Sequence, residues 1–285
     1  MRSSEEIKNI IINKANSDDR IRAVLLNGSR ANTKVTPDKF QDFDIVFMVT
    51  ELNSFIADHS WTNIFGDKLI FQLPNEMSFG NEKETCSFTY LMLFKDGNRI
   101  DLTLFPLEKL KTNFSKDSLT IVWVDKGNLF TGIAPSDDSD YIIKTPSEKE
   151  FADTCNEFWW VSTYVAKGLL RNEIVYAKEM YETVVRKMFL KMVEWYIGTE
   201  TDFTVSTGSH GKFIEKYLAV DLYQKILSTY SDYRVKNTWN SLFMMIDLFG
   251  QLSLIIADRL GFQYNTDEEI NVKLYLRQCY EQTGL

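Results

Sequence analysis

The chain has 285 residues, of which 44% are hydrophobic and 25% are charged, as expected for a soluble protein of one large or two moderate domains. The net charge is −8, and residues 1–145 and 146–285 share that acidic excess equally. Because an acidic protein repels polyanions, the composition argues against a nucleic-acid partner and favours a cationic substrate.

The sequence also bears on compartment. The start, MRSSEEIKNI, lacks an apolar signal core, and no continuous apolar run is long enough to span a membrane, so we expect no membrane association. The cysteines, Cys86, Cys155 and Cys279, are far apart and form neither a metal motif nor a disulfide framework, which favours a reducing cytoplasm. The two histidines, His59 and His210, are isolated, so we expect neither to be catalytic.

The first half of the chain is predicted to form strands and short helices. Near the N-terminus, Ser3 or Ser4 can cap a helix whose apolar residues recur at helical spacing. Short apolar runs predict strands at 21–27, 43–50, 68–73, 88–94, 99–105 and 119–125. Asp96 and Gly97 stand between two of these runs and are a strong signal for a β-hairpin.

The second half is predicted to be helical. Pro146 precedes Ser147 and Glu150, whose spacing is that of a capping box. Apolar periodicity predicts helices at about 148–170, 173–198, 211–229 and 235–260. The predicted fold class is therefore α+β, with a mixed-sheet domain of residues 1–145 followed by a helical domain of residues 146–285. A cleft between such domains is a common place for a ligand.

Three acidic residues stand in or beside the predicted strands. Asp42 and Asp44 open the second strand, and Asp101 lies inside a later one. Because side chains alternate along a strand, Asp42 and Asp44 share one face, and Asp101 stands opposite its apolar neighbours. Carboxylates spaced about 7 Å apart on one face repel each other, and a divalent cation is the usual compensation. Such a set can hold one or two Mg²⁺ ions, as in metal-assisted phosphoryl-type displacement.

A Gly-Ser pair directly after the first strand provides a candidate phosphate site. Gly28 lets the backbone approach a phosphate, Ser29 adds a hydroxyl donor, and Arg30 adds a guanidinium fork. Arg30 could equally be a surface residue, and Asp-x-Asp by itself could be a solvated strand end. The ordered set of strand, Gly-Ser, Asp-x-Asp and a third Asp within a strand favours the functional interpretation.

This ordered set resembles the nucleotidyltransferase superfamily related to DNA polymerase beta. Four segments are similar to the aminoglycoside 6-adenylyltransferases, the streptomycin-modifying resistance enzymes: RIRAVLLNGSRAN (20–32), FQDFDIVFMVT (40–50), FKDGNRIDLTLFP (94–106) and CNEFWWVSTYVAKGLLRNE (155–173). The resemblance implies ATP and Mg²⁺ as cosubstrates and the 6-hydroxyl of streptomycin as acceptor. It implies that Asp42 and Asp44 bind metal and that Asp101 binds metal, activates the acceptor, or does both. Ser29 and Arg30 would hold phosphate.

The first long helix of the second half carries a mixed stripe on one face. In order, the stripe contains Asp153, Glu157, Trp160, Tyr164, Lys167 and Arg171. A solvated face is the simpler interpretation, although it leaves two large aromatic side chains in water. In the functional interpretation, Asp153 and Glu157 bind a polycationic acceptor. Trp160 or Tyr164 packs against a ring of that acceptor, and Lys167 reaches the triphosphate of ATP.

Other functions fit parts of this pattern. The alternatives are a nucleotidyltransferase that acts on a protein or another small molecule, and a degenerate nucleotidyltransferase-like binding protein. The presence of all three carboxylates argues against the degenerate form. A haloacid-type phosphatase places its nucleophilic Asp at the end of a strand, whereas Asp42 stands before one. The sequence leaves open the oligomeric state and whether Asp101 is a base or only a metal ligand.

Overall fold

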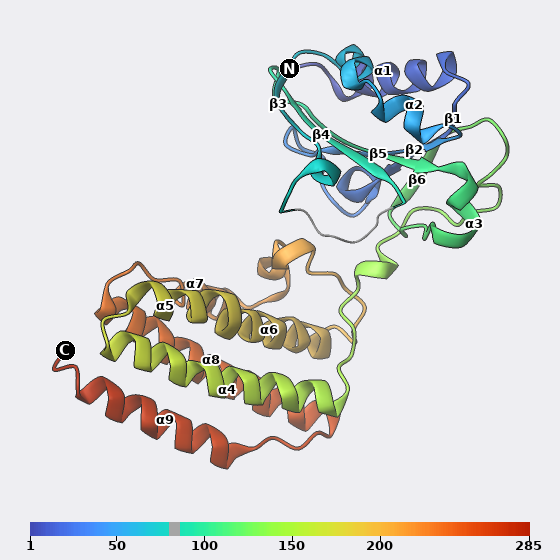
Figure 1. Ribbon diagram of the computed structural model, residues 1–285. Helices are drawn as coiled ribbons and strands as arrows, with labels where there is room; N and C mark the ends of the chain where they lie inside the picture. Colours follow the sequence, from blue (N-terminus) through green and yellow to red (C-terminus); the bar gives the residue numbers. More distant parts are fainter. Residues whose placement is uncertain (80–85) are drawn as a thin grey trace. The chain divides into compact units, whose positions relative to one another are not determined.

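The computed structural model describes residues 1–79 and 86–285. It divides into two compact units, Met1–Asp140 and Tyr141–Leu285, here named the sheet unit and the helical unit (Figure 1). The predicted boundary between residues 145 and 146 falls a few residues after this division, in the polar segment ahead of the first long helix. The α+β class predicted from the sequence is confirmed.

A mixed sheet forms the centre of the sheet unit, where the described residues contribute β1 Ile21–Asn27, β2 Phe43–Val49, β3 Lys68–Gln72, β4 Phe88–Phe94, β5 Arg99–Pro106 and β6 Thr120–Asp125. Their order across the sheet is β3-β4-β5-β2-β1-β6. Strands β2 and β5 are parallel, and every other neighbouring pair in this order is antiparallel. Each run predicted as a strand forms one, and the turn at Asp96 and Gly97 joins β4 to β5 as predicted.

Helix α1, Ser4–Ser17, lies along one face of this sheet (Figure 1). Ser3 caps it in a capping box with Glu6, and Ile7, Ile11 and Ala15 are fully buried. These residues join a core that includes alternate residues of β2, Phe43, Ile45, Phe47 and Val49. Because side chains alternate along a strand, the opposite face receives Asp44 and its neighbours.

Short helical turns connect the strands of the sheet unit. They are η1 Gly28–Ala31, α2 Leu52–Ile56, η2 His59–Phe65, η3 Pro74–Glu76, η4 Leu107–Lys109, α3 Leu110–Asn113 and η5 Ser139–Tyr141, which runs to the first residue of the helical unit. A second, smaller core of Ala23, Leu25, Met48 and Phe105 lies on the sheet face away from α1. That face is thus partly covered, and its polar part lies where β1 ends and β2 and β5 begin.

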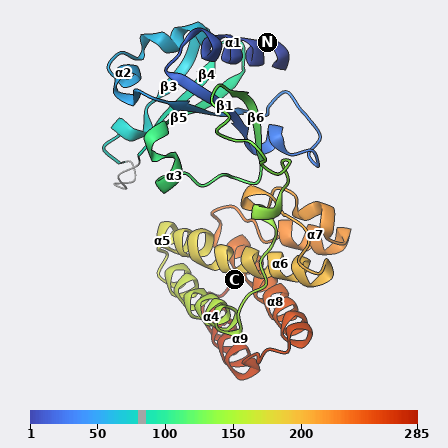
Figure 2. The ribbon, with the colours of Figure 1, turned by 90° about the vertical axis from the view of Figure 1, so that its right-hand side faces the viewer.

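The helical unit is built on long helices that pack side by side (Figure 2). Its helices and turns are α4 Glu148–Leu170, α5 Ile174–Glu179, the π-helical turn η6 Met180–Val185, α6 Arg186–Glu200, η7 Ser209–Gly211, η8 Ile214–Tyr217, α7 Val220–Leu227, α8 Val235–Leu260 and α9 Thr266–Glu281. The capping box of Ser147 and Glu150 is formed as predicted. The predicted helix at 211–229 is wrong over its first part, where short turns precede α7, and α9 was not predicted.

Helix α8 has the length and apolar composition of a membrane span, but 61% of its most apolar window is buried inside the structure. Phe249 of α8 stacks on Phe158 of α4 with ring centroids 3.6 Å apart. Trp239, Leu242 and Leu252 are buried in the same core. These contacts are those of a core helix, so its apolar composition is weak evidence for a membrane span.

Candidate active site

A row of polar side chains crosses the sheet on the face away from α1. Asp101 of β5 is directly opposite Asp44 of β2, and Asp44 is in turn opposite Asn27 of β1. Asn27 is opposite Thr120 of β6, whose hydroxyl donates to Asn27 Oδ1 at 2.9 Å. Because opposed residues on neighbouring strands point to the same face, this register brings two of the predicted carboxylates together.

Arg99, which sequence reasoning missed, lies beside these carboxylates at the start of β5. Its Nε and Nη2 donate to the two carboxylate oxygens of Asp101, both at 2.7 Å. Its Nη1 lies 3.5 Å from Asp42 Oδ2. The guanidinium therefore contacts two of the three predicted metal ligands. The available sequence signal was the Arg-x-Asp spacing, which places two side chains on the same face of a strand.

The electrostatics of the cluster follow from these contacts. Burial raises the pKa of the Asp42 carboxyl; Arg99 opposes this shift, while Asp101 adds to it. The hydrogen bond to Asp101 raises the pKa of Arg99, and the charges of Asp42 and Asp44 act in the same direction. The face thus gathers more negative than positive charge, which is the condition that a bound cation relieves.

Gly28 brings the backbone against this cluster. It has a φ of +71°, and a Cβ at this position would lie 2.2 Å from Asp44 Oδ2. Only glycine therefore fits, because any side chain would both strain the backbone and collide with the carboxylate. Ser29 follows in the turn η1, and its carbonyl accepts a hydrogen bond from Gln41 Nε2 at 3.3 Å. The structure thus places the predicted phosphate-binding backbone directly beside Asp44.

Arg30 points toward the segment that leads into β2. Its Nε and Nη2 donate to Gln41 O at 3.2 and 2.7 Å, and Nε also donates to Asp42 O at 3.0 Å. Its Nη1 donates to Ser4 Oγ at 3.0 Å, and the guanidinium stacks 3.8 Å from the ring centroid of Phe43. Arg30 thus braces the backbone at Asp42, and its contact with phosphate stays a prediction.

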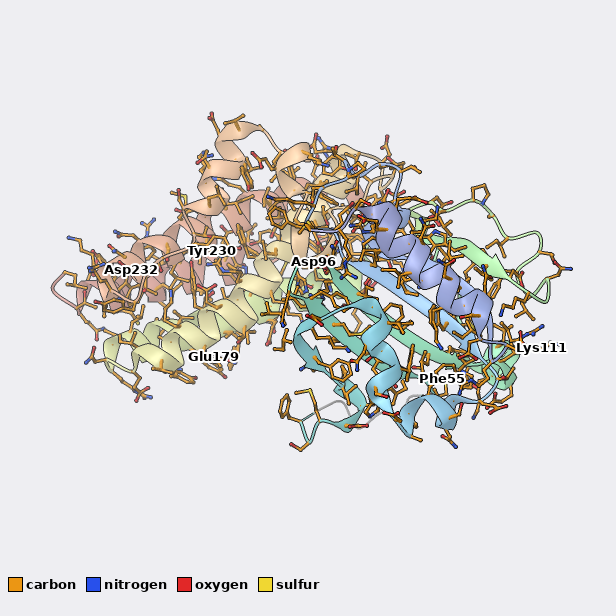
Figure 3. The ribbon with its side chains drawn as sticks, turned by 90° about the horizontal axis from the view of Figure 1, so that it is seen from above. Phe55, Asp96, Lys111, Glu179, Tyr230 and Asp232 are labelled. Atoms are coloured by element: carbon orange, nitrogen blue, oxygen red, sulfur yellow. The ribbon has the colours of Figure 1, made fainter. Side chains whose placement is uncertain are left out.

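The hairpin before Arg99 is also anchored. Asp96, labelled in Figure 3, accepts hydrogen bonds from Arg2 N at 3.1 Å and Arg2 Nε at 2.6 Å. It also accepts from Asn98 N at 3.1 Å. The contact with Arg2 holds the pKa of the Asp96 carboxyl well below its usual range. These bonds fix the turn and therefore the point at which β5 presents Arg99 and Asp101.

The carboxylates suit a hard divalent cation in their chemistry. Oxygen donors are what Mg²⁺ prefers, and Asp44 and Asp101 are directly opposed on neighbouring strands. Over residues 1–79 and 86–285, no group of three or more Asp, Glu, His or Cys side chains has the geometry of a formed metal site. Arg99 holds both oxygens of Asp101 in this arrangement. Asp42, Asp44 and Asp101 therefore remain the predicted metal ligands, and in this arrangement Arg99 pairs with two of them.

The predicted stripe lies mostly on the exposed side of α4, but Tyr164 is partly buried and Arg171 follows the last residue of the helix. Asp153 accepts two hydrogen bonds from Lys149 Nζ, at 3.0 and 2.8 Å. Trp160 is 57% exposed and donates to the Tyr164 hydroxyl at 2.6 Å. Lys167 Nζ lies 5.5 Å from the Tyr164 ring centroid. The stripe thus pairs an exposed Trp160 with a partly buried Tyr164 between charged side chains, and its role stays a prediction.

The helical unit also has a hollow of about 420 Å³ beside α6. Arg186 is buried there, hydrogen-bonded to Glu182 and Thr229 and stacked 3.6 Å from the ring centroid of Tyr230, which Figure 3 labels. Glu194 accepts a hydrogen bond from the Thr207 hydroxyl at 3.1 Å, and burial raises its pKa. Lys187 and Lys191 line the same hollow. Acidic and basic side chains therefore line this hollow together.

Comparison with known proteins gives one consistent answer. A sequence model of the streptomycin adenylyltransferase family matches residues 1–279. The chain is 41% identical to an aminoglycoside 6-adenylyltransferase of Campylobacter jejuni, with 98% of this chain and 96% of that protein covered. It is 38% identical to one from Bacillus subtilis (strain 168), with 94% and 95% covered, and 37% identical to one from Staphylococcus aureus, with 99% and 100% covered.

Among solved structures, an aminoglycoside 6-adenyltransferase from Bacillus subtilis is 35% identical to this chain, with 98% and 99% of the two chains covered and a TM-score of 0.48. The class of protein that the sequence comparisons define is that of the aminoglycoside nucleotidyltransferases. The chain belongs to the streptomycin adenylyltransferase family. The resemblance predicted from the four sequence segments is confirmed.

Proposed function

We propose that this protein transfers AMP from ATP to a hydroxyl of an aminoglycoside, with the 6-hydroxyl of streptomycin as acceptor, and thereby gives resistance to that antibiotic. The observation that carries the proposal is the opposed pair Asp44 and Asp101 beside Gly28, in a chain of this family. The names of three relatives, each an aminoglycoside 6-adenylyltransferase, support the acceptor class and the position.

In this proposal ATP binds with Mg²⁺ at the carboxylate face. Asp42, Asp44 and Asp101 hold the metal, which neutralises charge on the triphosphate. The turn at Gly28 and Ser29 offers backbone N–H groups and a hydroxyl to phosphate oxygens. Arg30 keeps Asp42 in place through the carbonyl groups that it binds. Cofactor and nucleotide thus share one face of the sheet.

Asp101 takes the proton of the acceptor. As the acceptor hydroxyl forms its bond to the α-phosphorus, the bond from that phosphorus to the β-phosphate oxygen breaks and pyrophosphate leaves. The hydroxyl proton must pass to a base, and general-base help contributes about 10²–10⁴-fold to such reactions. Asp101 comes from a different strand than Asp42 and Asp44, so we assign it a mixed role as base and metal ligand.

The exposed stripe on α4 binds the acceptor. Asp153 and Glu157 attract the guanidinium and amino groups of an aminoglycoside, in a chain whose net charge is −8. Trp160 or Tyr164 packs against a sugar ring, and Lys167 contacts the triphosphate. Support comes from the location of these side chains on one solvent-facing side of the helix.

We expect the enzyme to work in the cytoplasm, where ATP and its antibiotic substrate meet, without a nucleic-acid partner or membrane association. Cys86, Cys155 and Cys279 are free thiols, as a reducing compartment permits. The acidic composition disfavours binding to polyanions. The partners are then two small molecules, ATP and the aminoglycoside.

The experiment that tests this function is an acceptor screen. Purified protein is incubated with ATP, Mg²⁺ and each of a panel of aminoglycosides, and pyrophosphate release is followed beside the mass of the acceptor. Streptomycin-dependent pyrophosphate release with one adenylyl group added at the 6-hydroxyl is the expected result. If none of the aminoglycosides in the panel supports pyrophosphate release, the proposal is contradicted. If another hydroxyl is adenylylated, the proposed position is wrong.

A further inference from the structure

Arg99 is the basic residue that the sequence did not single out, and its place in the cluster is specific. Its side chain is 42% exposed, while those of Asp42 and Asp101 are 37% and 21% exposed. It forms a two-bond fork with Asp101 and a third contact with Asp42. A guanidinium paired to a carboxylate in this geometry is among the stronger polar interactions of proteins.

This fork occupies the oxygens that a metal would need. Both carboxylate oxygens of Asp101 accept a hydrogen bond from Arg99 at 2.7 Å, and the nearest oxygen of Asp42 lies 3.5 Å from Nη1. A divalent cation bound by Asp101 has to take at least one of these oxygens. Arg99 and a divalent cation therefore compensate the same negative charges and compete for the same carboxylate oxygens.

We propose that Arg99 is the resident counter-ion of the carboxylate face and must be displaced from Asp101 when a divalent cation binds. Arg99 then sets the metal affinity of the nucleotide-free protein and keeps it low. The inference rests on the proposed function, because that function assigns Asp42, Asp44 and Asp101 to the metal. It adds a regulatory role for a residue that holds neither metal nor substrate.

The displacement explains how metal binding can be tied to the nucleotide. A bare divalent cation must break the fork and leave a guanidinium beside it, and two like charges close together repel. A cation that arrives with a triphosphate brings negative charge, which offsets that repulsion. The protein therefore favours the metal–nucleotide complex over the free metal.

The opposite role for Arg99 predicts the opposite change in metal affinity when Arg99 is removed. If Arg99 only holds the carboxylates in a geometry that suits metal, its removal lets them move apart and metal binds more weakly. If Arg99 competes with metal, its removal frees the carboxylates and metal binds more tightly. The direction of the change in metal affinity therefore decides between the two roles.

The test is a titration of Mn²⁺ into nucleotide-free protein, with free Mn²⁺ followed by electron paramagnetic resonance. We expect Arg99→Gln to bind Mn²⁺ at least about tenfold more tightly than the unchanged protein, since a charge-assisted fork no longer opposes binding. Arg99→Lys keeps the charge but not the fork, so its affinity should lie between the two. It also serves as the folded variant if Arg99→Gln does not fold.

Lys95→Gln is the matched charge control. Lys95 lies in the same hairpin and pairs with Asp67 at 3.6 Å, with the two side chains 67% and 84% exposed. This change removes the same charge without touching the cluster, so Mn²⁺ affinity should stay unchanged. Comparable tightening in Lys95→Gln would show a general charge effect and overturn the role of Arg99. Unchanged or weaker Mn²⁺ binding by the Arg99 variants, or no binding by any protein, would also overturn it.

Thermal unfolding gives a second readout that is independent of turnover. Without metal, Arg99→Gln removes a positive charge from beside Asp42 and Asp101, so the unfolding temperature of the variant should fall. Added Mg²⁺ should raise the unfolding temperature of the variant more than that of the unchanged protein. A fall that Mg²⁺ does not restore would contradict the proposal. Neither measurement uses ATP or an acceptor, so both can be interpreted even if the adenylyl transfer assay fails. Likewise, the transfer assay can be interpreted if the role proposed for Arg99 is wrong.

Discussion

Asp44 of β2 and Asp101 of β5 lie directly opposite one another on parallel strands, although α2, η2, β3, η3 and β4 stand between them in the sequence. This register places two carboxylates on the sheet face that lies away from α1. Gly28 packs against Asp44 from the start of η1, directly after the neighbouring strand β1. The chemistry proposed for the protein depends on this juxtaposition, and the predictions below probe it from several sides.

Asp42→Asn and Asp44→Asn should each lower adenylyl transfer by about 10³-fold or more, because loss of a metal ligand removes several kcal/mol of transition-state stabilisation. Both changes keep the size of the side chain, so circular dichroism should show an unchanged fold. Turnover and circular dichroism should be measured on the same preparations. Near-normal turnover by either variant would remove that residue from the metal site.

Gly28→Ala should lose both stability and activity, because its Cβ would meet Asp44 Oδ2 at 2.2 Å. Gly132→Ala is the matched control, since Gly132 has a φ of +74° but no atom within 4 Å of an added Cβ. Backbone strain should cost each variant about 1 kcal/mol, measured by denaturant unfolding. Adenylyl transfer should collapse only in Gly28→Ala. Equal turnover by the two variants would show that Gly28 is not part of the active site.

Arg30→Gln distinguishes bracing of Asp42 from contact with phosphate. The side chain binds two backbone carbonyls and stacks on Phe43, so its loss should cost about 2 kcal/mol of unfolding free energy and lower kcat through Asp42. The KM for ATP should change little. A large rise in that KM with unchanged stability would instead support the phosphate contact that the sequence predicts for Arg30.

Asp153→Asn combined with Glu157→Gln should raise the KM for streptomycin and leave that for ATP nearly unchanged. The effect should shrink at high salt, because exposed charges are screened over about 8 Å at physiological ionic strength. A matched control is Asp258→Asn with Glu281→Gln, which removes two exposed acidic charges from other helices of the same unit. If the KM for ATP rises instead, the stripe serves the nucleotide.

Much of the fold could be predicted from the sequence because local signals were strong. Alternating apolar runs, turn residues at Asp96 and Gly97, and capping boxes at Ser3 and Ser147 each act within a few residues. Helix α9 escaped because its apolar pattern is weak, with only Leu276 and Cys279 buried. The helix predicted at 211–229 was too long because Gly211 has a left-handed backbone and the extended backbone at Leu218 and Ala219 separates η8 from α7.

The site was predictable in its carboxylates but not in their neighbours. Asp42, Asp44 and Asp101 follow from strand alternation, which is a local rule. Asn27 and Thr120 come together only because β1 pairs with β6. The order of strands in a sheet cannot be predicted from the spacing of residues along the chain. In the sequence, Arg99 resembles an ordinary exposed strand residue. Only the parallel pairing of β2 with β5 shows that it lies beside Asp42.

The central claim is that Asp101 helps the acceptor hydroxyl attack ATP at this carboxylate face. The most direct test compares adenylyl transfer to streptomycin by the unchanged protein and by Asp101→Asn as a function of pH, beside calorimetric titration of Mg·ATP into both. We predict that Asp101→Asn still binds Mg·ATP, that its transfer falls about 10²–10⁴-fold, and that the remaining rate rises with pH as a deprotonated acceptor substitutes for the base. Transfer by Asp101→Asn at the unchanged rate, or lost Mg·ATP affinity with a flat pH dependence, would contradict the claim.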